Sequence, residues 1–95
     1  MKKNQYCIVR TDRAGVFFGL VKKNNGTSII MNDVRKIHYW EGASAVEQIA
    51  VDGVNQNKSK LTISIPEMEI ASPIQIIPCT EKAINNLKNC KEWKM

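Results

Sequence analysis

Alternating apolar and polar residues predict β-strands along most of the chain. Residues two apart share one face of a strand, so Gln5–Thr11 divides into a Tyr6 face and a Cys7 face. Val16–Lys23 is almost continuously apolar, which is typical of a strand covered on both faces, and the adjacent Phe17 and Phe18 then lie on opposite faces. Further strands are predicted at Thr27–Met31, Val34–Trp40, Lys60–Ile65, Glu67–Ile70 and Ile74–Ile77.

Glycine, asparagine and aspartate mark the connections between the first strands. Asp12–Gly15 is typical of a tight turn, and Asn25–Gly26 indicates a hairpin because both residues tolerate positive φ. Gly19, inside a strand, indicates a bulge or a close approach of another backbone. Asn32–Asp33 is expected to separate two strands. Short turns between antiparallel strands predict a β meander.

Two short helices are predicted after the meander. Ala45–Val51 is expected to begin with a capping box formed by Ser44 and Glu47, and glycine follows its end. A second helix begins after Thr80, whose hydroxyl can accept a hydrogen bond from a helix N–H. Its buried stripe is expected to hold Ile84, Leu87, Cys90 and Trp93. The fold class is therefore α+β: an antiparallel β meander or small partly open barrel with a short mid-chain helix and a C-terminal helix.

The size of the chain and its charge narrow the choice of partners. Its 95 residues predict a single domain over 1–95, with a modest core, and a homo-oligomer fits that size. Residues 1–40 carry eight basic and two acidic residues, whereas residues 41–95 carry six basic and seven acidic ones. A basic half that holds all three arginines favours an anionic partner. The alternative is a basic surface that only contacts water.

The sequence also bears on the cellular compartment. No run of eighteen apolar residues is present, so we expect no membrane span, and the first five residues lack the apolar segment of a signal peptide. Cys7, Cys79 and Cys90 are an odd number without a close pair, which favours buried thiols in a reducing compartment. We therefore expect the protein in the cytoplasm of the cell that makes it.

Residue patterns for catalysis and metal binding are missing from the sequence. His38 has no acidic residue on its strand face and no nucleophile nearby, so we expect a surface or pocket histidine rather than a general base. Glu67 and Glu69 alternate with apolar residues, as on a solvated strand face. The cysteines lack the spacing of zinc ligands, and the glycines do not form a phosphate loop. The sequence predicts no enzyme, no cofactor and no metal site.

Basic and aromatic residues gather near the predicted strand Val34–Trp40. Arginine presents a planar fork of donors that suits phosphate, and aromatic rings stack on nucleobases. The predicted ligand-binding residues are Arg10, Arg13, Arg35, Lys36, His38, Tyr39 and Trp40. The alternative for Trp40 is a place in the core, where it would fill space before the helix.

Four segments form a recognisable series: Ala14–Gly19, Val34–Ala43, Gln48–Val54 and Ile76–Ala83, of which the Tyr-Trp-Glu-Gly-Ala run is the most specific. In this order they resemble an uncharacterised family of small phage and prophage proteins, which implies the cytoplasm of a host bacterial cell. The resemblance implies an accessory protein made in an infected or lysogenic bacterium, and it transfers no site residue. Relatives often carry a second arginine where this chain has Lys36, so a bidentate contact from that position is not expected.

The charge and the resemblance together suggest a function in binding. The leading hypothesis is a non-enzymatic counter-defence protein that sequesters an anionic, nucleotide-type small molecule with a basic and aromatic site. The partner would be that ligand or a host defence protein. The alternatives are a structural component of the virion and a small nucleic-acid-binding protein.

Overall fold

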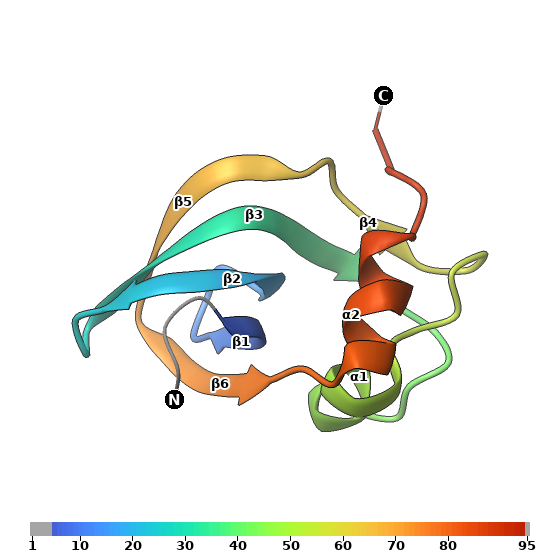
Figure 1. Cartoon of the computed structure of the whole chain (residues 1–95), viewed down its shortest axis with the longest axis horizontal. Helices are drawn as coiled ribbons and strands as arrows, with labels where there is room; N and C mark the ends of the chain where they lie inside the picture. Colours follow the sequence, from blue (N-terminus) through green and yellow to red (C-terminus); the bar gives the residue numbers. More distant parts are fainter. Residues whose placement is uncertain (1–4, 95) are drawn as a thin grey trace.

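A computed structural model describes residues 5–94 of the protein, which form one curled antiparallel sheet and two short helices (Figure 1). The elements in chain order are β1 (Gln5–Thr11), β2 (Val16–Asn24), β3 (Ser28–Tyr39), α1 (Val46–Asp52), β4 (Lys60–Leu61), β5 (Ile65–Ala71), β6 (Pro73–Pro78) and α2 (Glu81–Lys88). The α+β class predicted from the sequence is confirmed, with strands in the majority.

Strand β3 is the longest strand and organises the sheet. It pairs with β2 along one edge, and with β5 and then β4 along the other. On the far side, β2 pairs with β1, and β1 pairs with β6. The sheet order among the described strands is β4-β3-β2-β1-β6, with β5 beside β3, and all these pairs are antiparallel.

The sheet curls without closing. β5 and β6 follow one another in the chain, yet they lie at opposite edges of the sheet and diverge from a shared turn at Ser72 (Figure 1). Ser72 has φ 55°, and its N–H donates to the Thr27 carbonyl at 2.9 Å. Neither β5 nor β6 has a second strand partner within residues 5–94. Two strand edges are therefore left open.

Both faces of the sheet carry a hydrophobic core, as the adjacent phenylalanines predict. Phe18 belongs to a core beneath the helices, together with Ile8, Ile37, Val46, Ile49, Ala50, Val54, Leu61, Cys79, Ala83, Leu87 and Cys90. Phe17 belongs to a core on the other face, with Cys7, Val9, Val21, Ile29, Met31, Val34 and Ile70. The nearly continuous apolar run of β2 follows from this double burial.

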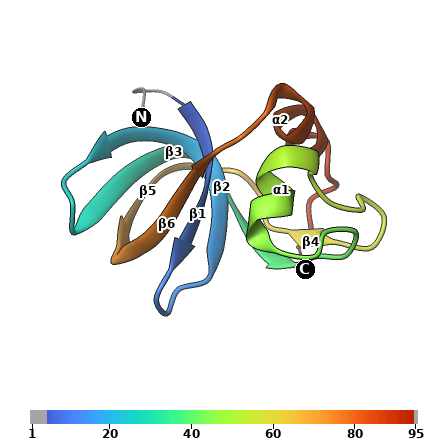
Figure 2. The ribbon, with the colours of Figure 1, turned by 90° about the horizontal axis from the view of Figure 1, so that it is seen from below.

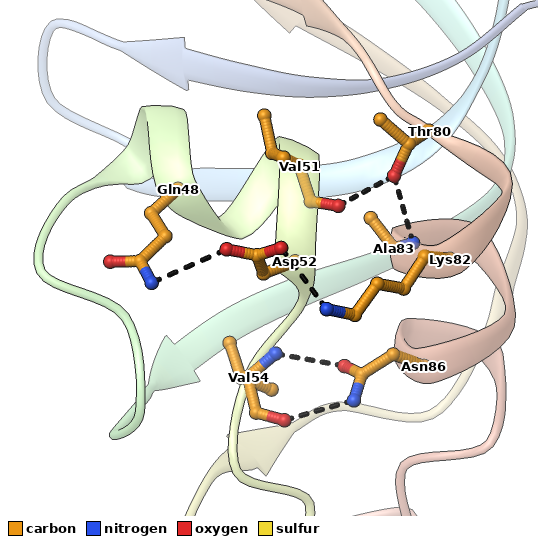
Figure 3. A network of polar contacts seen from close by, with 8 residues as sticks. All are labelled: Gln48, Val51, Asp52, Val54, Thr80, Lys82, Ala83 and Asn86. Atoms are coloured by element: carbon orange, nitrogen blue, oxygen red, sulfur yellow. Dashed lines mark hydrogen bonds and ion pairs between the residues drawn. The ribbon is translucent and has the colours of Figure 1, made fainter.

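The two helices lie side by side at one end of the sheet (Figure 2). Figure 3 shows the polar contacts that join them. Thr80 caps α2 as predicted, because its hydroxyl accepts from the Ala83 N–H at 3.1 Å, and it also donates to the Val51 carbonyl at 2.6 Å. Asn86 bonds both backbone groups of Val54, at 2.8 and 2.9 Å. The end of α1 is thereby fixed to the side of α2.

The expected interruption at Asn32–Asp33 was wrong. β3 runs through it, because Asp33 adopts φ 52° and the register shifts opposite Gly19. A Cβ on Gly19 would lie 3.1 Å from the Asn32 carbonyl oxygen and 3.1 Å from the Val34 Cα. Gly19 therefore allows both the bulge and the close approach that its position predicts.

Three smaller predictions also fail. Ser44 and Glu47 form no capping box: Ala45 precedes α1, and Ser44 instead bonds the Gln48 side-chain oxygen. The predicted strand Lys60–Ile65 stops at Leu61 and leaves Ile63 41% exposed. The expected buried stripe of the second helix ends early: α2 stops at Lys88, and the last two stripe residues, Cys90 and Trp93, belong to the irregular segment after it. The contact that replaces the capping box spans four residues, whereas the segment after α2 is held by the distant Leu61 carbonyl.

Candidate ligand-binding surface

The predicted site residues on β3 divide between its two faces, since neighbouring residues of a strand point in opposite directions. Lys36 pairs with Phe17 and Arg35 with Phe18, so these two lie on opposite faces, and a register shift at Ile37–Tyr39 interrupts the alternation before His38 and Tyr39. The structure therefore does not bring all seven predicted residues to one place. Each part of the set has its own surroundings.

Arg35 is buried, with 6% of its surface exposed. Its Nε donates to the Thr62 carbonyl at 2.8 Å and its Nη1 to the Leu87 carbonyl at 2.7 Å. Its Nη2 reaches the carbonyls of Leu61 and Lys91, both at 3.4 Å. These contacts tie the last turn of α2 and the segment after it to β4. They favour a structural role for Arg35 over the ligand contact suggested by the sequence.

Arg10 and Arg13 lie at the end of β1 and in the turn after it. Arg10 is exposed opposite Gln75 of β6, whose side chain bonds the Glu47 carboxylate at 3.0 Å. Arg13 is 95% exposed and pairs with Asp12 at 3.7 Å. A surface pair of this kind holds its arginine weakly, so Arg13 can turn to another anion.

Tyr39 and Trp40 are engaged locally. The Tyr39 hydroxyl donates to Glu41 at 2.6 Å, which raises the pKa of the phenol, while the ring is 45% exposed. The Trp40 indole N–H donates to the Ala43 carbonyl at 3.3 Å, and its half-buried ring packs against the core beneath the helices. The core interpretation of Trp40 fits these contacts better than a ligand contact.

We name five side chains the basic–aromatic band: His38, Lys60 and Trp93, which contact one another, and Lys36 and Arg13, which lie at the turn after β1. The His38 and Trp93 rings stack with centroids 4.5 Å apart and 18° between their planes. Lys60 Nζ lies 5.5 Å from the centre of the Trp93 ring. Lys36 lies across Gly15, where an added Cβ would be 2.9 Å from its Cε, and so extends toward the turn that holds Arg13.

Arg35 supports this band from beneath. It holds the Leu61 and Lys91 carbonyls, and the Trp93 N–H donates to the same Leu61 carbonyl at 2.8 Å. The segment after α2 is thus fixed along β4, and 43% of the Trp93 surface remains exposed. His38 and Lys60 therefore flank one partly exposed indole.

Sequence reasoning missed Trp93 and Lys60 as members of a site. The spacing of three from Cys90 favoured a helix for Trp93, whereas α2 ends five residues earlier. The pairing of Tyr39 with Lys60 between β3 and β4 brings Lys60 beside the aromatic rings. No local pattern in the sequence signals that pairing.

A second polar cluster lies behind the band. Asp33 accepts hydrogen bonds from the Ser64 hydroxyl and, at 2.7 Å, from the Tyr6 hydroxyl. The hydrogen bond from Ser64, and to a smaller extent that from Tyr6, lowers the pKa of the Asp33 carboxyl. Lys88 Nζ lies 4.2 Å above the Tyr6 ring. Asp33 and Lys88 line a cavity of about 120 Å³ in which acidic and basic groups are balanced.

The other groups with potential reactivity are inactive or dispersed. All three cysteines are buried, and burial raises the pKa of Cys7 to about 11 and of Cys79 to about 12. Within residues 5–94 no three His, Cys, Asp or Glu side chains gather as metal ligands do. The part of the chain that the structure describes holds no helix long and apolar enough to cross a membrane.

Comparison with known proteins gives one match. A family model described as Domain of unknown function (DUF6948) matches residues 4–87, which include all four motif segments. No curated protein and no solved structure matches the chain.

Proposed function

The chain belongs to the DUF6948 family, whose function is unknown, and we propose that it is a non-enzymatic protein that binds an anionic, nucleotide-type ligand at the basic–aromatic band. The observation that carries this proposal is the exposed Trp93 ring, stacked on His38 with Lys60 above it. His38 covers one face of the indole, so a base would take the face over which Lys60 lies, and the Lys60 ammonium would move aside to the phosphate.

The roles of the residues follow from their chemistry. Trp93 would stack on the base, a contact that is worth about 1–3 kcal/mol for each base. Lys60 and Lys36 would hold phosphate as point charges, and the mobile fork of Arg13 would add a planar contact. His38 orients the indole by stacking and would donate a ring N–H to phosphate. Arg35 acts as a positioning residue, because it fixes the segment that carries Trp93.

The test is binding of fluorescently labelled oligo-dT of increasing length and of mononucleotides, measured by anisotropy at low and at moderate salt. From the stacking energy, Trp93→Ala is expected to weaken binding about 5- to 150-fold. Lys60→Ala should lower both the affinity and the slope of its salt dependence. Lys22→Ala, an exposed lysine outside the band, is the matched control and should leave both unchanged.

The outcomes separate two sources of the same chemistry. Affinity that grows with strand length and falls steeply with salt indicates a single-stranded nucleic acid. A mononucleotide that binds as tightly as the longest oligo-dT indicates a small-molecule ligand. Absence of binding to all of these probes, or equal binding by Trp93→Ala, would refute the band as a nucleotide site.

The biological setting of the proposal comes from the phage resemblance. We place the protein in the cytoplasm of an infected or lysogenic bacterium, where sequestering a nucleotide signal would blunt a host defence. Expression in a defended bacterial strain should then raise phage yield, and Trp93→Ala should remove that gain. Recovery of the protein in purified particles would instead favour the virion alternative.

A further inference from the structure

The two open edges of the sheet differ in a way that bears on assembly. β5 carries Pro66, Glu67 and Glu69 along its edge, and prolines and charges are features that keep a strand edge from pairing with another chain. β6 is Pro-Ile-Gln-Ile-Ile-Pro: prolines bound it at both ends, but its four inner residues include neither a proline nor a charge. Of the two edges, the inner part of β6 is therefore the less protected.

The most exposed large apolar side chains lie beside this less protected edge. Ile74 on β6 is 58% exposed and Val51 on α1 is 52% exposed. Gln75 links the two elements through its bond to Glu47, which is one helical turn before Val51. An apolar, uncharged strand edge with an exposed helical valine beside it is a surface that self-pairing would cover.

We propose that two copies of this chain associate through β6, edge to edge and antiparallel, so that their sheets become continuous. A second copy suits the edge because two uncharged strands meet without repulsion, whereas two β5 edges would bring Glu67 and Glu69 together. Association also removes the aggregation hazard of a bare apolar edge.

Symmetry restricts the register of this pairing. A two-fold axis perpendicular to the sheet maps each face onto itself, and directly opposite residues share a face. The axis must therefore lie midway between the two copies of one residue, which then face each other. An axis at Gln75 pairs Ile74 with the Ile76 position of the second copy. An axis at Ile76 would pair Ile74 with a proline instead. The exposed Ile74 therefore favours the axis at Gln75.

The first test is mass as a function of concentration, by light scattering and by analytical ultracentrifugation. A strand pair is a small interface, so we expect a concentration-dependent equilibrium between 10.8 kDa and twice that mass. Ile74→Lys should weaken association at least tenfold. Ile63→Lys, also at an exposed isoleucine but between β4 and β5, is the matched control and should associate like the wild type.

A crosslink tests the register. Opposite Cα atoms in an antiparallel pair lie about 4.5–5.5 Å apart, within reach of a disulfide. Gln75→Cys should therefore give a covalent dimer on mild oxidation, while Ile63→Cys should not, and the three buried native thiols give little background.

A wild type that stays monomeric at about 1 mM, or an Ile74→Lys variant that associates equally well, would overturn the proposal. A Gln75→Cys variant that forms no crosslink in a dimeric sample would overturn it as well. Nucleotide binding plays no part in these experiments, so they stand or fall independently of the basic–aromatic band.

Discussion

Arg35→Met should be among the most damaging single substitutions in this protein. It removes a guanidinium that is 6% exposed and donates to four backbone carbonyls. The two short bonds, at 2.7 and 2.8 Å, are charge-assisted and worth about 1.5–3 kcal/mol each, and the two at 3.4 Å are left out of the sum. Methionine fills much of the space but leaves the carbonyls unsatisfied. We expect a loss of about 3–5 kcal/mol of unfolding free energy.

Urea unfolding, followed by far-UV circular dichroism and tryptophan fluorescence, measures this loss. At about 4–8 °C per kcal/mol for a domain of this size, the melting temperature should fall by at least about 12 °C. Trp93 provides a second readout: its emission should shift to the red before global unfolding, because the segment that holds it loses its anchor. The stability of Arg35→Lys should fall between those of the wild type and Arg35→Met, since one ammonium cannot bond carbonyls of both α2 and β4.

Arg13→Met is the control for this experiment, because the Arg13 side chain is 95% exposed. Its unfolding midpoint should match the wild type. If Arg35→Met lowers the unfolding free energy by less than about 1 kcal/mol, then the hydrogen bonds of the guanidinium do not hold α2 to β4, and the structural role assigned to Arg35 is wrong.

Three further substitutions or treatments test other parts of the structure. Asp33→Asn should destabilise the protein at neutral pH and progressively less below about pH 4. The reason is that a carboxyl with a lowered pKa loses its stabilising charge as the pH falls through that pKa. Urea unfolding of both proteins between about pH 2.5 and pH 7 measures the difference. Gly53→Ala should lower the melting temperature much more than Gly26→Ala. Both glycines have positive φ, but only at Gly53 would an added Cβ collide with a side chain, that of Asn86. A thiol reagent at pH 8 should modify none of the three cysteines in the native protein and all of them in denaturant, because they are buried and the pKa of Cys79 is about 12.

The sequence predicted those parts of the fold that depend on neighbouring residues. Two-residue alternation located β1, and a nearly continuous apolar run located β2 and placed Phe17 and Phe18 on opposite faces. The Thr80 cap needs only the helix that it begins. Asp33 was different. It is a turn-forming residue that stays inside a strand because Ser64 and Tyr6, 31 and 27 residues away, bond its carboxylate.

The candidate site shows the same division. Charge and residue type indicated Arg35, Lys36 and His38 together, but the faces of β3 separate Arg35 from Lys36. Trp93 reaches His38 from 55 positions away through an irregular segment, so no periodicity could reveal it. Sequence reasoning can thus locate a basic and aromatic region but not the face on which it is assembled.

The turn at Ser72 has a consequence for the order in which the chain folds during synthesis. It sends two consecutive strands to opposite edges of the sheet, so β1, made first, obtains its second neighbour only when β6 emerges about 65 residues later. Until then the backbone N–H and C=O groups along the outer edge of β1 have no strand partner. Pairings this distant in sequence close slowly. The nascent chain should therefore remain protease-sensitive until residue 78 has left the ribosome, and then become resistant in a single late step.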